Sequence, residues 1–318
     1  MIKTEVIVVG GGPAGAACAR RLMQGQAQCL VLDRAIFPRP KPCAGWIPPA
    51  VLKLAGATPG SYPFGLTEYQ SFEIMLGSLH FRLRTRQYAI RRFEFDHWLL
   101  QNSAAPFYQQ DVHEIRLEKG QFVVDDAFTA PYLVGAGGTH CPVYRTFFQQ
   151  TRPRQVSGLI IAQEEEFPYA IQDGRLRLWF FQDRLPGYAW YVPKKDGYLN
   201  VGVGGSNQGL RRHTESLKSH WAHLVRRLEQ DGLVRDHAWQ PVGYSYYLRP
   251  RRLRGRIGNA FLAGDALGLA TGDMGEGIGP ALQSGLLAAE AILTGSAYSA
   301  ASIPRSSLPS LLGLRREG

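Results

Sequence analysis

Residues 5–15 read Glu-Val-Ile-Val-Val-Gly-Gly-Gly-Pro-Ala-Gly, and the rest of the chain is organised around this stretch. Its apolar first half is typical of a buried parallel strand. The glycines at 10, 12 and 15 follow directly with the G-x-G-x-x-G spacing. Because the sequence predicts a helix at 16–23 and a second apolar strand at 29–33, the whole stretch predicts one βαβ unit.

Each part of this βαβ unit has a physical role in holding a dinucleotide. Gly10 permits the tight turn, Gly12 lets a pyrophosphate approach the backbone, and Gly15 lets helix and strand pack closely. The pyrophosphate would lie against the unpaired N–H groups at the positive end of the helix. Asp33, the last residue of the second strand, would accept hydrogen bonds from the adenosine ribose. We therefore predict a bound adenine dinucleotide, with a merely glycine-rich turn as the alternative.

Composition places the chain among globular proteins. Its 318 residues are 45% hydrophobic and 19% charged, enough for one large domain or two smaller ones. Residues 1–4 lead directly into the first strand, so no signal peptide is expected, and Gln283, Ser284 and Glu290 interrupt the longest apolar stretch. The four cysteines form no CxxC pair, which favours a reducing cytoplasm without disulfides or a bound metal. We expect a cytoplasmic protein.

The net charge of +10 favours anionic partners, although solubility alone would explain it equally well. Residues 249–256 read Arg-Pro-Arg-Arg-Leu-Arg-Gly-Arg, in which the proline and glycine exclude a long helix. One interpretation is a solvated surface turn. The other is peripheral docking on an anionic membrane, or on a diphosphate or phospholipid head group, and no nucleic acid is expected. The arginines concerned are Arg249, Arg251, Arg252, Arg254 and Arg256.

Alternating and helical patterns predict the remaining elements. The first half is expected to contain a short helix at 50–55, antiparallel strands at 66–90 with a hairpin near 77–78, a helix at 91–100, a β-meander at 111–134 with a turn at 119–120, and a parallel strand at 132–134. The second half is expected to contain antiparallel strands within 156–205, one amphipathic helix at 211–230, a strand at 260–263, a helix ending at 293 and a disordered tail. His220 and His223 could share a metal on that amphipathic helix, but surface histidines are the simpler interpretation.

Three segments, 10–33, 134–145 and 260–278, resemble the cofactor site of the FAD-dependent oxidoreductases with the p-hydroxybenzoate hydroxylase fold. Within that group the chain is most similar to the geranylgeranyl reductase family, over residues 3–295. The most specific match is Gly-Asn-Ala-Phe-Leu-Ala-Gly-Asp-Ala at 258–266, followed by Gly-Asp-Met-Gly-Glu-Gly-Ile at 272–278. The resemblance implies a mixed α/β and α+β protein, with a Rossmann-type FAD-binding domain and an inserted antiparallel β-sheet substrate domain. The FAD-binding domain is expected at 1–60, 91–150 and 255–295, the substrate domain at 61–90 and 151–254, and the tail at 296–318.

The resemblance also implies which residues contact FAD. Asp265 would bond the ribityl chain, and the helix start after Gly275 would stabilise negative charge on the reduced flavin. Lys-Pro-Cys-Ala-Gly at 41–45 resembles the family loop beside the isoalloxazine, and Gly137 stands where many relatives carry Asp. The expected cofactor contacts are Gly10, Gly12, Pro13, Ala14, Gly15, Asp33, Arg34, Cys43, Ala44, Gly45, Arg92, Val112, Gly137, Gly264, Asp265, Gly275, Gly277 and Ile278.

Residues 186–193, Pro-Gly-Tyr-Ala-Trp-Tyr-Val-Pro, resemble the aromatic strand that lines the substrate cavity of the reductases. They also resemble a strand of flavin halogenases, where Tyr188 would be replaced by tryptophan. Cys43, Tyr188 and Trp190 are the catalytic candidates, with an ordinary packed cysteine as the alternative for Cys43. Of the aromatic residues Trp179, Phe181, Tyr188, Trp190 and Tyr191, alternate members must face away from a cavity, and packing against a helix would explain them equally well.

These features predict an FAD enzyme that reduces carbon–carbon double bonds of an isoprenoid or other apolar substrate. No second G-x-G-x-x-G unit is present, so electrons would come from transient NAD(P)H, or from a ferredoxin or quinol as the electron-donor partner. A flavin-dependent hydroxylase or halogenase is the alternative. The third hypothesis is a flavoprotein without turnover that binds a lipid or partner. It is supported because this sequence stops about where relatives add a helical C-terminal segment over the substrate cavity.

Overall fold

The computed structural model describes residues 1–212 and 215–313, and the chain folds as two compact units. The first unit comprises Met1–Arg39, Phe93–Gln155 and Tyr246–Ser307. The second unit comprises Pro40–Arg92, Val156–Ser245 and residues 308–313. The predicted domain boundaries stay a prediction. Residues 40–60 belong here to the second unit, because β4 (Trp46–Ile47) pairs with β6 (Leu79–Ala89) of that unit.

The first unit is built on a six-stranded sheet with the order β17-β18-β11-β2-β3-β7. Its strands are β2 (Val6–Val9), β3 (Cys29–Asp33), β7 (Phe107–Gln109), β11 (Tyr132–Gly135), β17 (Arg256–Ile257) and β18 (Ala260–Leu262). All neighbours are parallel except the β17–β18 pair at the edge. The two predicted parallel strands at 5–9 and 29–33 are therefore confirmed, and so is the one at 132–134.

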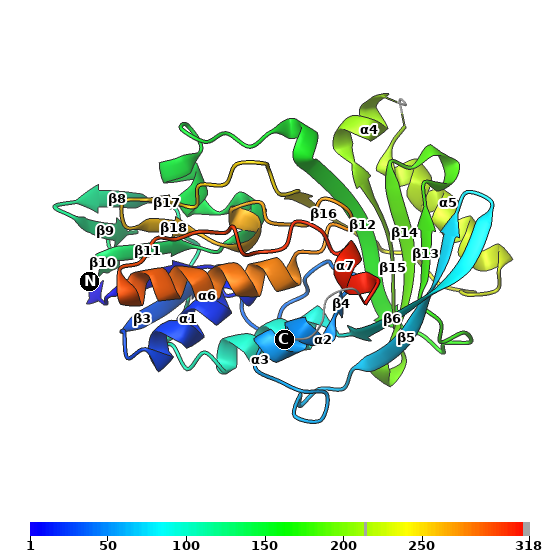
Figure 1. The fold of residues 1–318 in the computed structure, drawn as a ribbon, viewed down its shortest axis with the longest axis horizontal. Coiled ribbons are helices and arrows are strands. Elements are labelled where there is room, and N and C mark those ends of the chain that lie inside the picture. The colour runs from blue at the N-terminus through cyan, green and yellow to red at the C-terminus, as the bar shows by residue number, and fades with distance from the viewer. Residues whose placement is uncertain (213–214, 314–318) are drawn as a thin grey trace. The chain divides into compact units, whose positions relative to one another are not determined.

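Two helices cover one face of this sheet. α1 (Pro13–Gln24) and α6 (Ile278–Thr294) lie side by side in Figure 1, blue beside orange. Val8, Val134 and Phe261 point toward these helices, each of them fully buried. Because strand residues alternate between faces, Ile7 and Leu133 point to the opposite side and join a second apolar core.

The predicted β-meander covers that opposite side. It is a four-stranded sheet with the order β1-β10-β9-β8. Its strands are β1 (Ile2–Lys3), β8 (Ile115–Glu118), β9 (Gln121–Val124) and β10 (Phe128–Ala130). The turn between β8 and β9 falls at Lys119 and Gly120, as predicted, with φ of 48° and 80°. Phe122 and Phe128 join the core under the parallel sheet.

The second unit is built on an eight-stranded sheet with the order β16-β12-β15-β14-β13-β5-β6-β4. The strands not yet given are β5 (Thr67–Leu76), β12 (Leu159–Pro168), β13 (Arg177–Phe180), β14 (Gly187–Lys194), β15 (Tyr198–Ser206) and β16 (Val242–Tyr247). The predicted hairpin at 77–78 joins β5 to β6. β13 pairs with β5 in parallel, which differs from the antiparallel expectation, because these two strands come from separate stretches of the chain.

The predicted helix at 211–230 is two helices. α4 (Asn207–Arg212) ends early, residues 213–214 lie outside the described part, and α5 (Leu217–Gln230) begins after Ser216. The Ser216 hydroxyl accepts a hydrogen bond from Ser219 N at 3.1 Å, so this N-cap starts a new helix. α5 packs one face of the sheet, seen in yellow in Figure 1, through Trp221 and Leu224. The other helices are α2 (Pro49–Leu54), α3 (Arg92–Gln101) and α7 (Leu308–Leu311).

The segment after α6 was expected to be disordered, and the structure differs up to residue 313. Ala300 and Ile303 are 8% and 2% exposed, and they pack against Leu269. Arg249 fixes this segment by donating hydrogen bonds to Ala300 O at 2.6 Å and to Pro304 O at 3.2 Å. The sequence pattern did not predict this order, because the segment is held by hydrogen bonds between its backbone carbonyls and an arginine that is distant in the sequence.

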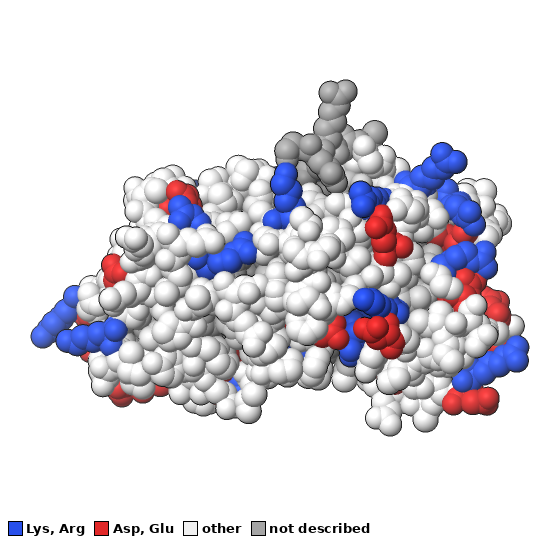
Figure 2. All heavy atoms as spheres, turned by 90° about the horizontal axis from the view of Figure 1, so that it is seen from below, with Lys and Arg blue, Asp and Glu red and all other residues white. Residues whose placement is uncertain are grey.

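Two observations concern the helices and the surface. Within the described residues, no helix combines the length and apolar character needed to cross a bilayer. On the face shown in Figure 2, Lys and Arg side chains are interspersed with Asp and Glu side chains. That face therefore carries no large field of one charge.

Candidate functional site

The glycine-rich turn between β2 and α1 shows the close contacts that its spacing predicts. Gly10 has a φ of +115°, and an added Cβ would lie 2.3 Å from Ala136 O. At Gly15 an added Cβ would lie 1.8 Å from Gly10 O. No side chain fits at either position, so both glycines are required by packing before any ligand is considered. Ala136 belongs to the second predicted segment, which therefore lies against the first.

The third predicted segment meets the other two at α1. Gly264 has a φ of +60°, and an added Cβ would lie 3.0 Å from the Cβ of Ala14. Gly285 would place a Cβ 2.1 Å from Ala14 O, so the two helices approach backbone to backbone. The Ser284 hydroxyl accepts a hydrogen bond from Gly264 N at 2.8 Å and donates one to Ala281 O at 2.9 Å. All three segments thus form one site in the first unit.

The start of α1 is suited to bind an anion. Gly12 is the N-cap residue and has no side chain, and Pro13 follows at the first helical position. The N–H groups of the first turn therefore receive no capping side chain. An added Cβ at Gly12 would meet only Arg39 Nη2, at 3.4 Å. The backbone is open here apart from one cationic side chain, which fits the pyrophosphate of a dinucleotide.

Arg39 was not predicted as a site residue. Its Nη2 lies 3.4 Å from Oδ2 of Asp96, whose side chain is fully buried. Its guanidinium also lies 4.8 Å from the centre of the Phe37 ring. A cation is thereby fixed beside Gly12, where it could neutralise a phosphate. The proline-rich loop gives no periodic signal that would have identified it.

Asp33 holds the glycine turn from the end of β3. Its Oδ2 accepts a hydrogen bond from Gly11 N at 2.7 Å, and its Oδ1 accepts one from Ala35 N at 2.9 Å. The carboxylate therefore lies at the carboxyl edge of the parallel sheet, where a dinucleotide binds in such folds. Its contact with a ribose stays a prediction.

Asp265 lies in a turn of 3-10 helix at Gly264–Ala266, and its Oδ1 would be 3.4 Å from a Cβ on Gly277. The carboxylate thus faces the start of α6, and its contact with the ribityl chain stays a prediction. Arg154, which was not predicted, fixes the turn by donating a hydrogen bond to Ala266 O at 2.7 Å. Burial lowers the pKa of Arg154, which stacks 3.8 Å above the Tyr144 ring.

The loop before α6 is held by its own hydrogen bonds. Glu276 N donates to the Thr271 hydroxyl at 3.0 Å, and Ser307 N donates to Asp273 at 2.8 Å. Gly275 has a φ of +65°, and an added Cβ would lie 2.3 Å from the Tyr246 hydroxyl oxygen. A glycine is therefore required where the helix start is expected to face the flavin.

The other predicted cofactor contacts are less tightly placed, and their contacts with FAD stay predictions. Val112 is 5% exposed and packs in the core under the parallel sheet. Arg34 is exposed, and an added Cβ at Gly137 would lie 3.3 Å from Cys141 Cα. The predicted contacts that belong to the second unit are Cys43, Ala44, Gly45 and Arg92.

The aromatic strand β14 divides its side chains between the two faces of the second sheet. Tyr191, with Trp179 of β13, belongs to the apolar core against α5. Tyr188 and Trp190 alternate with them and lie on the opposite face, with ring centroids 5.8 Å apart. Phe181 is 62% exposed beyond the end of β13. Packing against a helix therefore explains Trp179 and Tyr191, but not the two predicted catalytic aromatics.

A buried polar network lies next to Trp190. An added Cβ at Gly202 would lie 2.2 Å from the Trp190 indole, so the indole crosses β15 at a glycine. The indole N–H donates to Asn200 Oδ1 at 2.7 Å. Asn200 Nδ2 lies 3.4 Å from both Glu164 Oε1 and Cys43 O, and Cys43 N donates to Glu164 Oε1 at 2.5 Å. This network joins two motifs that the sequence identified separately, although Glu164 and Asn200 were not predicted.

Two carboxylates of this network differ in charge state. Burial raises the pKa of Glu164 to about 7, against the opposing effects of Lys194, the Cys43 N–H group and Asn200. Burial also acts on Glu166, but Lys194 Nζ at 2.6 Å and Arg91 Nε at 2.9 Å outweigh it and hold the Glu166 pKa below its usual range. Glu164 therefore titrates near neutral pH, while Glu166 stays ionised.

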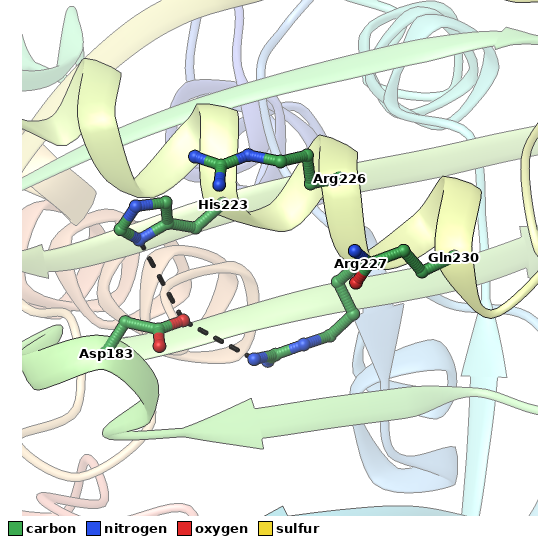
Figure 3. A pocket seen from close by; sticks show the side chains of 5 residues that line it. All are labelled: Asp183, His223, Arg226, Arg227 and Gln230. Atoms are coloured by element: carbon green, nitrogen blue, oxygen red, sulfur yellow. Dashed lines mark hydrogen bonds and ion pairs between the residues drawn. The ribbon is translucent and has the colours of Figure 1, made fainter.

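The two histidines on α5 have separate partners. His220 is 4% exposed, with Nε2 at 2.7 Å from a Glu215 oxygen, so the expectation of a surface histidine is wrong for this residue. In Figure 3, His223 and Arg227 both point toward Asp183, at 3.9 and 3.4 Å. The hollow drawn there is lined by Asp183, His223, Arg226, Arg227 and Gln230. Among the residues the structure describes, no group of three or more His, Cys, Asp or Glu could hold a metal ion.

Comparison with known proteins agrees with this architecture. No protein-family model matches the chain. An uncharacterized protein of Methanosarcina barkeri is 30% identical over 314 residues, covering 92% of this chain and 75% of that one. A menaquinone reductase of Mycolicibacterium smegmatis is 28% identical over 92% of this chain and 77% of its own. A digeranylgeranylglycerophospholipid reductase of Methanosphaera stadtmanae is 25% identical over 93% and 80%.

Solved structures extend the likeness to the fold. A geranylgeranyl bacteriochlorophyll reductase-like protein of Thermoplasma acidophilum matches with a TM-score of 0.78 and 21% identity, over 92% of this chain and 78% of that one. The flavin-dependent halogenase CmlS matches with a TM-score of 0.74 and 18% identity, over 92% and 58%. The fold and the glycine-rich site define an FAD-dependent oxidoreductase of the p-hydroxybenzoate hydroxylase type. Within that class, the chain belongs to the geranylgeranyl reductase family.

Proposed function

We propose that this protein reduces carbon–carbon double bonds in the prenyl chain of a lipid-like substrate. The observation that carries the proposal is the arrangement of Tyr188 and Trp190 on the face of the second sheet opposite α5. Tyr188 also lies 5.2 Å from Phe180 and 6.2 Å from Trp46, between ring centroids. Such an aromatic cluster, in which Tyr188 is half-buried and Trp190 is buried, suits an apolar chain better than a polar ligand. Relatives named as prenyl-lipid and menaquinone reductases support this substrate class.

Residues of the first unit would hold the cofactor. The start of α1 and Arg39 would bind the pyrophosphate, Asp33 the ribose, and Asp265 the ribityl hydroxyls. Bound FAD, once reduced, supplies the hydride that a carbon–carbon double bond needs. The N–H groups at the start of α6 would stabilise negative charge at that end of the site, because they lie at the positive end of the helix.

Residues of the second unit would orient the substrate and exclude water. Trp190 is held by its hydrogen bond to Asn200, so its indole keeps one orientation. Cys43 is held by its backbone hydrogen bond to Glu164. We propose that the thiol of Cys43 and the aromatic pair contact the prenyl chain where it reacts.

The electron donor belongs to the proposal as well. The sequence has one G-x-G-x-x-G unit, which the FAD site uses. We propose that the donor binds transiently, as NAD(P)H, a ferredoxin or a quinol. Steady-state reduction of the bound flavin with each donor in turn would identify it.

Peripheral membrane contact would bring a prenyl lipid to the enzyme. Arg256 donates hydrogen bonds to Gly258 O and Ser296 O, and Arg249 is occupied by the segment after α6. This leaves Arg251, Arg252 and Arg254 as the exposed members of the arginine run. We propose that these three contact anionic lipid.

Product analysis separates reduction from oxygen chemistry. With reduced FAD and a geranylgeranyl substrate, we expect products that gain two hydrogens per double bond, and their formation should not require oxygen. Trp190→Phe should lower turnover, whereas Trp179→Phe, on the α5 face of the same sheet, should not. Hydroxylated or halogenated products that require oxygen would contradict the proposal and favour the monooxygenase-like alternative.

A further inference from the structure

Glu164 and Glu166 lie on the same face of the second sheet as Trp190. β12 pairs with β15 so that Glu164 lies opposite Gly202, and Gly202 in turn lies opposite Trp190 of β14. An added Cβ at Gly202 would contact both neighbours, at 2.2 Å from the indole and 2.8 Å from Glu164 Cβ. Glu165, between the two, points to the other face and pairs with His237 at 2.8 Å.

Glu164 fixes the backbone of the Cys43 loop. Its Oε1 accepts a hydrogen bond from Cys43 N at 2.5 Å, and Asn200 bridges the same carboxylate to Cys43 O. Both backbone polar groups of Cys43 are therefore held by two strands of the sheet, β12 and β15. Cys43 itself is half-buried, whereas Cys18, Cys29 and Cys141 are buried. The end of the loop is tied to the end of β6 by the backbone, because Ile90 N donates to Gly45 O at 2.8 Å. Cys43 itself is held by the side chains of Glu164 and Asn200, so its position depends on them.

We propose that Glu164 is a positioning residue for Cys43, whose carboxylate fixes the Pro40–Gly45 loop and whose protonation loosens it. The effect on turnover rests on the proposed function, but the effect on the loop does not. A hydrogen bond to an ionised acceptor is roughly twice as strong as one to a neutral acceptor. The loop should therefore be tighter when Glu164 is ionised.

The surrounding charges set the pH at which this happens. Lys194 and Arg91 face the carboxylates from one side, and Glu166 from the next position on the same face of β12. Both cations pair with Glu166, and Lys194 acts on Glu164 only through its charge. Burial then raises the pKa of Glu164 to about 7, so its charge changes within the physiological range.

A purely structural role would not need a titratable group here. A glutamine would offer the same acceptor oxygen to Cys43 N without the cost of burying a charge. An ionisable side chain at this position is therefore costly for stability, which is common where a group serves function. The charge state, and not only the presence of an acceptor, is the feature to test.

Labelling of Cys43 with a small thiol reagent tests the proposal in the complete protein, without substrate. The rate at the Cys43 peptide is measured by mass spectrometry and divided by the rate in denaturant at the same pH, which cancels thiol chemistry. In the wild-type protein this ratio should rise as pH falls from 8 to 6, with a midpoint near 7. Glu164→Gln should remove the pH dependence, and Glu164→Ala should raise the ratio about tenfold at pH 8.

Glu165→Gln is the matched control, because Glu165 is also buried, accepts a backbone hydrogen bond from Gln240 N and lies on the opposite face. It should leave the wild-type profile unchanged. A wild-type ratio without pH dependence, or a midpoint near 7 that persists in Glu164→Gln, would overturn the proposal. If labelling behaves as expected but no prenyl substrate is reduced, the positioning role stands and the proposed function fails.

Discussion

The glycine-rich site of the first unit and the polar network of the second unit are built on different principles. In the first, backbone approaches backbone, as at Gly15 and Gly285, so the residue type is fixed by space. In the second, the side chains of Glu164 and Asn200 hold the backbone of Cys43. Changes at these packed glycines should therefore act on folding, and changes in the polar network on charge and order.

The largest effect is expected at Gly15. Gly15→Ala places a Cβ 1.8 Å from Gly10 O, where only the backbone itself could move. We expect a loss of about 3 kcal/mol or more in the free energy of unfolding, measured by urea denaturation. Gly12→Ala is the matched control, because its Cβ would meet only Arg39. It should keep stability but lose FAD; equal destabilisation by both would contradict the steric interpretation.

Glu164→Gln should change how stability depends on pH. In the folded protein the pKa of Glu164 is about 7, whereas the pKa of a glutamate in the unfolded chain is 4.5. The free energy of unfolding of the wild type therefore falls as the pH rises from 4.5 through 7. The variant should lack that fall. Above pH 8 its free energy of unfolding should exceed that of the wild type by on the order of 3 kcal/mol. Urea denaturation at pH 5 and pH 8 measures it. A variant that is less stable than the wild type at pH 8 would show that the carboxylate is not costly there.

Asp265→Ala should weaken FAD binding without unfolding the protein. The loss of a charge-assisted hydrogen bond to the ribityl chain corresponds to about 1.5–3 kcal/mol, or roughly a ten- to hundredfold weaker Kd. Fluorescence titration of the apoprotein with FAD measures it. Asp265→Asn should be intermediate, since it keeps one acceptor. Unchanged affinity in Asp265→Ala would remove this residue from the site.

The smallest effect for each replaced residue is expected at the exposed arginines. Replacing Arg251, Arg252 and Arg254 by Gln should weaken the free energy of binding to anionic liposomes by about 1 kcal/mol for each charge, as measured by sedimentation. The effect should be smaller at high salt. A variant with Arg211, Arg212 and Lys218 replaced by Gln removes the same charge from another exposed surface. If both variants lose binding equally, or if the wild type binds neutral vesicles as well, the arginine run has no docking role.

The two regions also differ in how much the sequence revealed. The turn at Gly10, the strand before Asp265 and the pairing of the parallel strands follow from local spacing, and the structure has all three. Arg39 and Glu164 could not be predicted, because their partners are distant in the chain and no period connects them.

The structure differs from the predicted elements where a single contact outweighs the hydrophobic pattern of the sequence. The break between α4 and α5 depends on the single cap at Ser216. The ordered segment after α6 depends on Arg249, whose hydrogen bonds reach across to Ala300 O. Hydrophobic periodicity carries no information about either contact.

Anaerobic reoxidation of the reduced flavin tests the central claim most directly. The protein is loaded with FAD, reduced chemically without oxygen, and mixed with a geranylgeranyl lipid while the absorbance of oxidised flavin is followed. We predict rapid reoxidation, together with a product that has gained two hydrogens, and none with the fully saturated phytanyl analogue. Flavin that stays reduced with every geranylgeranyl compound, or that reoxidises equally with the saturated analogue, would contradict the account.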